Sequence, residues 1–278
     1  MSFAQATGAA VVELDMQLPF TAARARNAGW QRLVEMVPEI EAVQFVDGDC
    51  ELEAGWLQAA ARFLADNPAA AVVCGRRRER FPEASRYNAM CDAEWNTPVG
   101  RARECGGDAM MRLAALAAVG GFDPAIVAGE EPELCGRLRA EGWGIWRIDA
   151  PMTIHDAAIE RFSQWWVRAT RSGFGYAQTF AATRSRGEGL YGRELLRAGL
   201  WGGVVPALAL AGVVVGKPLV GALFAAGCVA QGLRLVRCHG LHRGSLLMLA
   251  KPAELLGALS WLGQQASSRR RPRAFAYK

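Results

Sequence analysis

Short apolar runs alternate with amphipathic stretches over the first two thirds of the chain. Each apolar run has four to six residues and ends at or just before Gly or Asp, which predicts buried strands at 11–14, 44–47, 70–75 and 144–149. Helical periodicity with caps or Gly/Pro stops predicts helices at 19–36, 54–64, 89–95, 111–119 and 130–142. Strands that alternate with helices predict an α/β fold, in which ligands bind beyond the carboxyl ends of the strands.

The pattern changes in the last third of the chain. Residues 198–216 form an uncharged run of 19 residues, Lys217-Pro218 interrupts it, and residues 219–233 are again uncharged. The first run is long enough to span a bilayer and the second is shorter, so we expect a hydrophobic helical hairpin. A buried hairpin in a soluble protein is the alternative. Residues 246–262 are expected to form an interfacial helix or a partial third span.

Basic residues flank this hairpin on both sides. Arg193 and Arg197 precede it, and Arg234 and Arg237 follow it. Because positive charge favours the cytoplasmic side, both ends are expected there, with Lys217 near the far tip. A basic tail at 269–273 suits anionic headgroups. We therefore expect a cytosolic domain at residues 1–180, a linker at 181–197, and membrane-associated helices with a basic tail at 198–278, all at the inner (cytoplasmic) membrane.

Composition narrows the classes of function. The 278 residues are 51% hydrophobic and carry a net charge of +5, with arginines scattered along most of the chain, so no nucleic-acid partner is expected. The seven cysteines include no CxxC pair and are expected to be reduced thiols in a cytosol-facing protein, not a disulfide framework or a zinc knuckle. The first ten residues do not resemble a cleavable signal peptide.

Two carboxylates follow the strand at 44–47. Asp47 and Asp49 are two residues apart, so on an extended backbone they point to the same side and can face one hard cation or a phosphate-bound cation. The alternative is an acidic turn between strand and helix in which Asp49 caps the next helix.

Further candidate groups come later in the chain. Glu130, Glu131 and Glu133 crowd the first turn of one predicted helix, where acids complement the helix dipole. Three acids where one would suffice suggest a second role for at least one of them. His155 follows the strand at 144–149 and is either a structural residue or a ligand. The arginine run at 76–80 is expected to be a solvated surface loop.

Several of these segments together resemble the family 2 glycosyltransferases of the GT-A fold. They are "ARNAG", "FVDGDCELEAGWL", "CGGDAMMRLAALAAVGGFDP", "GEEPELCGRLRAEGW" and a late His, within residues 11–175. The resemblance implies a Rossmann-like nucleotide-diphospho-sugar transferase domain. The family begins with two further strands that hold the nucleobase and ribose, so we expect an N-terminally truncated version of that domain.

The resemblance also implies a donor site. Such enzymes bind a nucleotide-diphospho-sugar with a divalent metal ion, Mn²⁺ or Mg²⁺. Asp49 matches the metal ligand of the family's DxD motif, Asp47 faces the ribose or the same cation, and His155 falls where some members add a ligand. Arg26, Asp108 and Glu130 are expected on the donor or acceptor side, with a solvated helix face as the alternative for Arg26.

Glu131 matches the family's catalytic base, which is usually an Asp. The resemblance implies inverting transfer to a glycan or lipid-linked acceptor at the cytosolic membrane face, with the base deprotonating the acceptor hydroxyl. The stretch Arg161-x-x-Gln164-Trp165 has Gln where processive members have Arg, which argues against a processive synthase. Arg168 and Arg171 either reach the diphosphate or form a basic helix face.

Two other classes of function stay open at this point. One is a catalytically inactive glycosyltransferase-like membrane subunit that binds a glycan, lipid or partner enzyme. The other is a small membrane protein in which the acidic motifs only cap helices.

Overall fold

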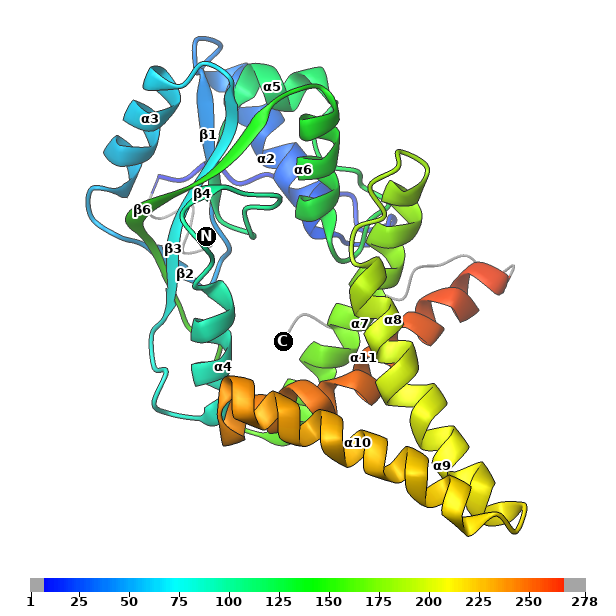
Figure 1. Ribbon diagram of the computed structural model, residues 1–278. Helices are drawn as coiled ribbons and strands as arrows, with labels where there is room; N and C mark the ends of the chain where they lie inside the picture. Colours follow the sequence, from blue (N-terminus) through cyan, green and yellow to red (C-terminus); the bar gives the residue numbers. More distant parts are fainter. Residues whose placement is uncertain (1–7, 268–278) are drawn as a thin grey trace.

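The computed structural model describes residues 8–267. A mixed sheet lies between helices in one half of the molecule, and long apolar helices extend from the other half (Figure 1). Within these residues the sheet has six strands in the order β1-β5-β3-β6-β2, with β4 paired to β6. The strands are β1 (Ala42–Phe45), β2 (Cys50–Leu52), β3 (Ala70–Glu79), β4 (Gly100–Arg101), β5 (Ala109–Arg112) and β6 (Gly144–His155).

The two longest strands, β3 and β6, run parallel to each other, and every other pairing in the sheet is antiparallel among the described residues. The pairing shifts register on either side of Arg76, so the sheet curls along its length. Gly75 lies at this bend. A Cβ there would come within 2.6 Å of the Ala150 carbonyl oxygen, so the close approach requires glycine.

Helices cover both faces of the sheet (Figure 1). α3 (Trp56–Asp66) buries Trp56, Ala60 and Leu64 against one face. α2 (Ala22–Met36), α5 (Leu113–Ala118) and α6 (Glu130–Ala140) lie over the other face. One hydrophobic cluster fills the space between these layers, centred on the apolar residues of β3 and β5. An α/β fold was predicted from the sequence, and the structure confirms it.

The helix predictions hold to within a few residues, but one strand prediction and one loop prediction were wrong. The expected strand at 11–14 is irregular chain, with Val11 and Val12 exposed, and within residues 8–267 β1 pairs only with β5. The expected loop through the arginine run is instead the second half of β3. That half is ordered by ion pairs with side chains distant in sequence, which no local pattern reveals.

A second hydrophobic cluster joins the sheet domain to the apolar helices. It lies between α4 (Arg86–Trp95), α7 (Phe162–Arg184) and α11 (Leu241–Ala266), and includes Tyr87, Trp165 and Leu246. α7 and α11 approach to backbone contact. A Cβ on Gly173 would lie 1.9 Å from the Glu254 carbonyl oxygen, and one on Gly257 would lie 1.9 Å from that of Thr170. Small residues thus allow the close packing of these two helices.

In the part of the chain that the structure describes, three helical segments are long and apolar enough to cross a membrane, as judged by length and composition. The first runs from Gly192 to Val214 as α8 (Gly192–Gly199), a π-helical turn η1 (Leu200–Val204) and α9 (Val205–Val214). The second is α10 (Pro218–His239), and α9 and α10 form the projecting hairpin of Figure 1. The third is α11, which is longer than the partial span expected. The basic tail expected at 269–273 lies outside the described residues.

Candidate functional site

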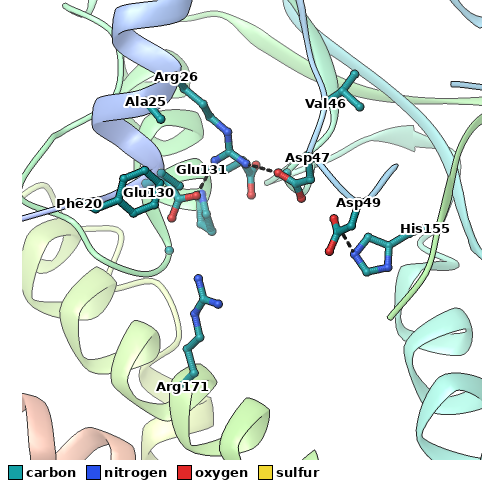
Figure 2. A pocket seen from close by; sticks show the side chains of 15 residues that line it. Phe20, Ala25, Arg26, Val46, Asp47, Asp49, Glu130, Glu131, His155 and Arg171 are labelled. Atoms are coloured by element: carbon teal, nitrogen blue, oxygen red, sulfur yellow. Dashed lines mark hydrogen bonds and ion pairs between the residues drawn. The ribbon is translucent and has the colours of Figure 1, made fainter. Parts of the chain in front are cut away.

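A cavity of about 740 Å³ opens beyond the end of β1. Figure 2 shows its lining, which comes from α2, the turn after β1, the N-terminus of α6, the end of β6 and one residue of α7. The acidic and basic side chains in it are Arg26, Asp47, Asp49, Glu130, Glu131, His155 and Arg171. The size is within the range of pockets that enclose small-molecule ligands.

Asp47 is held by two arginines. Its Oδ1 accepts from Arg26 Nη2 at 2.7 Å and its Oδ2 accepts from Arg77 Nη2 at 2.7 Å. Burial alone would raise the pKa of Asp47, but the charges of Arg26 and Arg77 outweigh it and hold the pKa below its ordinary value. The carboxylate is therefore ionised and fixed in orientation.

Asp108 lies behind Asp47 and is buried. Its Oδ1 accepts from the Asp47 backbone N–H at 2.9 Å, and its Oδ2 accepts from Thr153 Oγ1 at 2.8 Å and from Arg77 Nε at 2.9 Å. Because Asp108 is surrounded by protein donors, it positions the turn that carries Asp47. It lines a neighbouring cavity of about 350 Å³.

Asp49 and His155 lie next to each other in the lining of the larger cavity (Figure 2), with Asp49 Oδ1 3.3 Å from His155 Nε2. β2 pairs with the end of β6, which aligns Cys50 with His155. On the far side of the ring, His155 Nδ1 is buried 3.9 Å from the carboxylate of Glu79 and, among the described residues, has no hydrogen-bond partner. Burial and the charge of Arg77 lower the pKa of His155, so the neutral imidazole is favoured.

Two groups of side chains near the turn after β1 have the spacing of metal ligands. Asp49, Cys50 and His155 offer ligand atoms within 4.8 Å of one another, and so do Asp47, Cys50 and Asp108. The guanidinium of Arg77 contacts all three members of the second group, so a positive charge already lies there. The Asp49–Cys50–His155 group shares only Cys50 with these contacts, so it is the better suited of the two to a cation.

The three acids of α6 have separate roles. Glu130 pairs with Arg26 at 2.5 Å, so that Arg26 bridges Glu130 and Asp47 (Figure 2). Glu133 is buried and accepts from both Arg137 and Arg186, each at 2.8 Å, which anchors the helix. The remaining acid is Glu131.

Glu131 is buried between the two cavities and lines both. Its Oε1 accepts from the Cys105 backbone N–H at 2.5 Å and lies 3.1 Å from Cys135 Sγ. Burial, with a smaller contribution from the charge of Glu104, raises the pKa of Glu131 to about 7. A carboxylate with a pKa near neutrality and access to a cavity can accept a proton from a bound hydroxyl.

α7 closes the larger cavity on the side of the apolar helices. Arg171 points from α7 toward Glu130 and Glu131 (Figure 2). Arg168, one turn earlier, pairs with Glu94 of α4 at 2.8 Å and lines the smaller cavity. The cavity is thus bounded by carboxylates on one side and a basic helix on the other.

Six of the seven site residues predicted from the sequence line one cavity: Arg26, Asp47, Asp49, Glu130, Glu131 and His155. Asp108 lies behind it. Their functional roles stay predictions. Sequence reasoning missed Arg77 and Glu79, which orient Asp47 and approach His155 respectively. The available signal was the apolar run of β3 leading directly into charged residues, a place where a strand can deliver side chains to a site.

Comparisons with known proteins give a match in structure alone. No model of a protein family matches the chain, and no curated protein matches it in sequence. Among solved structures, the mannosyltransferase PcManGT from Pyrobaculum calidifontis, in complex with GDP-Man and Mn²⁺, matches 87% of this chain and 67% of its own, with a TM-score of 0.52 and 19% identity. The chain has a glycosyltransferase fold.

A second solved structure, S. aureus TarS 1-349, matches 90% of this chain and 73% of its own at 14% identity. Its TM-score of 0.35 is too low to support an argument. The glycosyltransferase fold therefore rests on the likeness to PcManGT.

Proposed function

We propose that this protein is an inverting, metal-dependent glycosyltransferase of family 2 with a GT-A fold. It would transfer a sugar from a nucleotide-diphospho-sugar donor to a glycan or lipid-linked acceptor at the cytosolic face of the membrane. One observation carries the proposal: the Asp49–His155 pair and the buried carboxylate of Glu131 face the same cavity. A cation site and a base are the two groups that such a transfer needs.

Asp49 and His155 would hold the divalent cation, Mn²⁺ or Mg²⁺. Their donor atoms lie close together, and the neutral imidazole favoured at His155 is the form that binds metal. Glu79 lies behind the ring, where a carboxylate commonly orients a metal-binding histidine. When bound, the cation would neutralise charge on the donor diphosphate as the sugar–phosphate bond breaks. Asp47, fixed by Arg26 and Arg77, is left to accept a hydrogen bond from the donor.

Glu131 would act as the base. Its pKa of about 7 leaves a large fraction of the carboxylate ionised at neutral pH, ready to take the proton of an acceptor hydroxyl. The contact with the Cys105 N–H fixes one oxygen of Glu131 and leaves the other for the substrate. Attack by the deprotonated hydroxyl on the face of the sugar opposite the diphosphate inverts the anomeric configuration.

The apolar helices would place the acceptor. α7 contributes Arg171 to the cavity and packs against α11, a candidate membrane span, so the cavity adjoins the helices that would meet lipid. Basic residues at both ends of the hairpin favour the cytoplasmic side for those ends and for the cavity. An acceptor held at the membrane surface would reach Glu131 from that side.

The test is calorimetric binding of GDP and of UDP with Mn²⁺ to the full chain in detergent. GDP is included because the structural neighbour PcManGT was solved with GDP-Man. We expect metal-dependent binding by the wild type and a loss of at least about tenfold in Asp49→Ala, since a first ligand of the cation is removed. Asp66→Ala, an exposed aspartate of α3, is the control and should bind as the wild type does. Equal binding by Asp49→Ala and the wild type would refute the proposed cation site.

A second candidate function is a catalytically inactive glycosyltransferase-like subunit that binds a glycan, lipid or partner enzyme. The observation in its favour is that both oxygens of Asp47 and one of Glu130 are already engaged by arginines. Under this alternative, neither GDP nor UDP binds with Mn²⁺, and no donor sugar is hydrolysed or transferred.

A further inference from the structure

Two buried thiols, those of Cys105 and Cys135, lie close to Glu131. Cys105 Sγ and Cys135 Sγ are 3.8 Å apart, and Cys135 Sγ is 3.1 Å from Glu131 Oε1. The two thiols and the carboxylate offer three ligand atoms within 4.8 Å of one another, all of them buried. Both cysteines are free. The proposed transfer reaction uses neither thiol.

The separation of the two sulfurs matches that of a tetrahedral zinc site, and the sulfur–oxygen separation is close to it. With Zn–S bonds of about 2.3 Å and a Zn–O bond of about 2.0 Å, two sulfur ligands lie about 3.8 Å apart and a sulfur and an oxygen about 3.5 Å apart. The observed distances are 3.8 Å between the sulfurs and 3.1 Å from sulfur to oxygen. A shift of a few tenths of an ångström in the Glu131 side chain would bring the distance between Cys135 Sγ and Glu131 Oε1 to the expected value.

We propose that Cys105, Cys135 and Glu131 form a binding site for a thiophilic divalent cation such as Zn²⁺, distinct from the site at Asp49 and His155. The cavity of about 350 Å³, lined by Cys105 and Glu131, gives the cation a path from solvent and room for a water as the fourth ligand. Cys74 also lines this cavity and supplies a third thiol nearby.

The chemistry of the ligands separates the two sites. Thiolates select soft or borderline cations such as Zn²⁺, whereas Mn²⁺ and Mg²⁺ prefer oxygen ligands.

Burial raises the pKa of Cys105 well above its ordinary value. Contact with Cys105 lowers the pKa of Cys135, but burial and the charge of Glu131 together outweigh this effect and raise the pKa to about 11. Both thiols are therefore protonated without metal, and binding of the cation releases two protons to solvent.

Occupation of this site would block the proposed base. A Glu131 carboxylate bound to Zn²⁺ cannot take a proton from the acceptor, so Zn²⁺ would inhibit transfer. Removal of Zn²⁺ by a chelator, followed by return of Mn²⁺, would restore it. This consequence rests on the proposed function, but the binding of the cation does not.

The first experiment titrates the reduced full chain in detergent with Co²⁺ and records the sulfur-to-cobalt charge-transfer absorption. We expect the wild type to develop this band and to lose it when Zn²⁺ displaces Co²⁺. Cys105→Ser and Cys135→Ser should each weaken the binding of Co²⁺ by more than about 100-fold. Loss of a residue that only supports a metal ligand typically costs about 10–100-fold in affinity, and each of these variants removes a ligand itself. Cys228→Ser, in α10, is the matched control and should keep the band. No band in the wild type, or a band unaffected by either variant, would overturn the proposal.

Asp49→Ala separates this proposal from the proposed function. The variant should lose Mn²⁺-dependent nucleotide binding and keep the cobalt–thiolate band. Loss of the band would show that Co²⁺ binds at Asp49, Cys50 and His155 and would overturn the proposal. X-ray absorption of the Zn²⁺-loaded wild type needs no variant. It should show two sulfur ligands at about 2.3 Å and an oxygen ligand at about 2.0 Å. A shell of nitrogen and oxygen alone would place Zn²⁺ elsewhere.

Discussion

Replacing Glu131 with Gln should stabilise the protein at alkaline pH. The pKa of Glu131 is raised by burial to about 7, against an ordinary value of 4.5. Below pH 4.5 the group is protonated in both the folded and unfolded states and contributes no pH dependence. Between these two pKa values the unfolded chain binds fewer protons, so the free energy of unfolding falls as pH rises. Above pH 7 the full destabilisation by the buried, ionised carboxylate is present. The difference between the pKa values of 4.5 and about 7 corresponds to about 3 kcal/mol in the free energy of unfolding.

Glu131→Gln removes this cost because the amide stays neutral at every pH, while its oxygen can still accept from the Cys105 N–H. The variant and the wild type should unfold with similar free energies near pH 4.5, and the variant should gain up to about 3 kcal/mol by pH 8. Urea unfolding in detergent at pH 5, 6, 7 and 8 measures the difference. Glu141→Gln, an exposed change on the residue that follows α6, is the control and should follow the wild type. Parallel pH dependence in Glu131→Gln and the wild type would show that Glu131 is an ordinary carboxylate and would remove the main support for its role as a base.

Two further changes test the packing that supports the site. Arg77→Met removes the counter-ion shared by Asp108, which is fully buried, and Asp47, which is partly buried. It should lower the free energy of unfolding by about 3 kcal/mol or more. Arg78→Met, at an exposed position of the same strand, should lower it by less than about 0.5 kcal/mol. Gly257→Ala places a Cβ 1.9 Å from the Thr170 carbonyl oxygen and should cost about 1–3 kcal/mol in thermal unfolding, whereas Gly263→Ala, which meets no atom within 4 Å, should not destabilise the protein. Equal effects within either pair would contradict the contacts described.

Local signals account for most of the helices. Thr21 caps α2 through its side chain, and the acids at the start of α6 mark its first turn. The i, i+2 spacing of Asp47 and Asp49 predicted that their carboxylates point to the same side, and both of them line the cavity. Their environments differ in a way that the spacing does not reveal, since Asp47 is held by two arginines and Asp49 faces His155.

The sequence alone did not predict the contacts between segments that are distant along the chain. Nothing local distinguishes Arg77 from its neighbours in the arginine run, because the residues that pair with it, Asp47 and Asp108, are 30 and 31 positions away. The segment at 11–14 is apolar enough for a strand, but a strand also needs a partner, which the sequence does not specify. The raised pKa of Glu131 likewise depends on burial between two cavities.

The backbone contact between α7 and α11 makes the orientation of the cavity depend on that of the apolar helices. At Gly173 and Gly257 no side chain separates the backbones of α7 and α11, so the two helices tilt as one unit. If α11 lies in a bilayer, its tilt varies with the thickness of the hydrocarbon layer. A thinner or thicker membrane would then rotate the cavity and its Arg171 side relative to the headgroups, so the lipid composition would influence how the cavity faces the membrane surface.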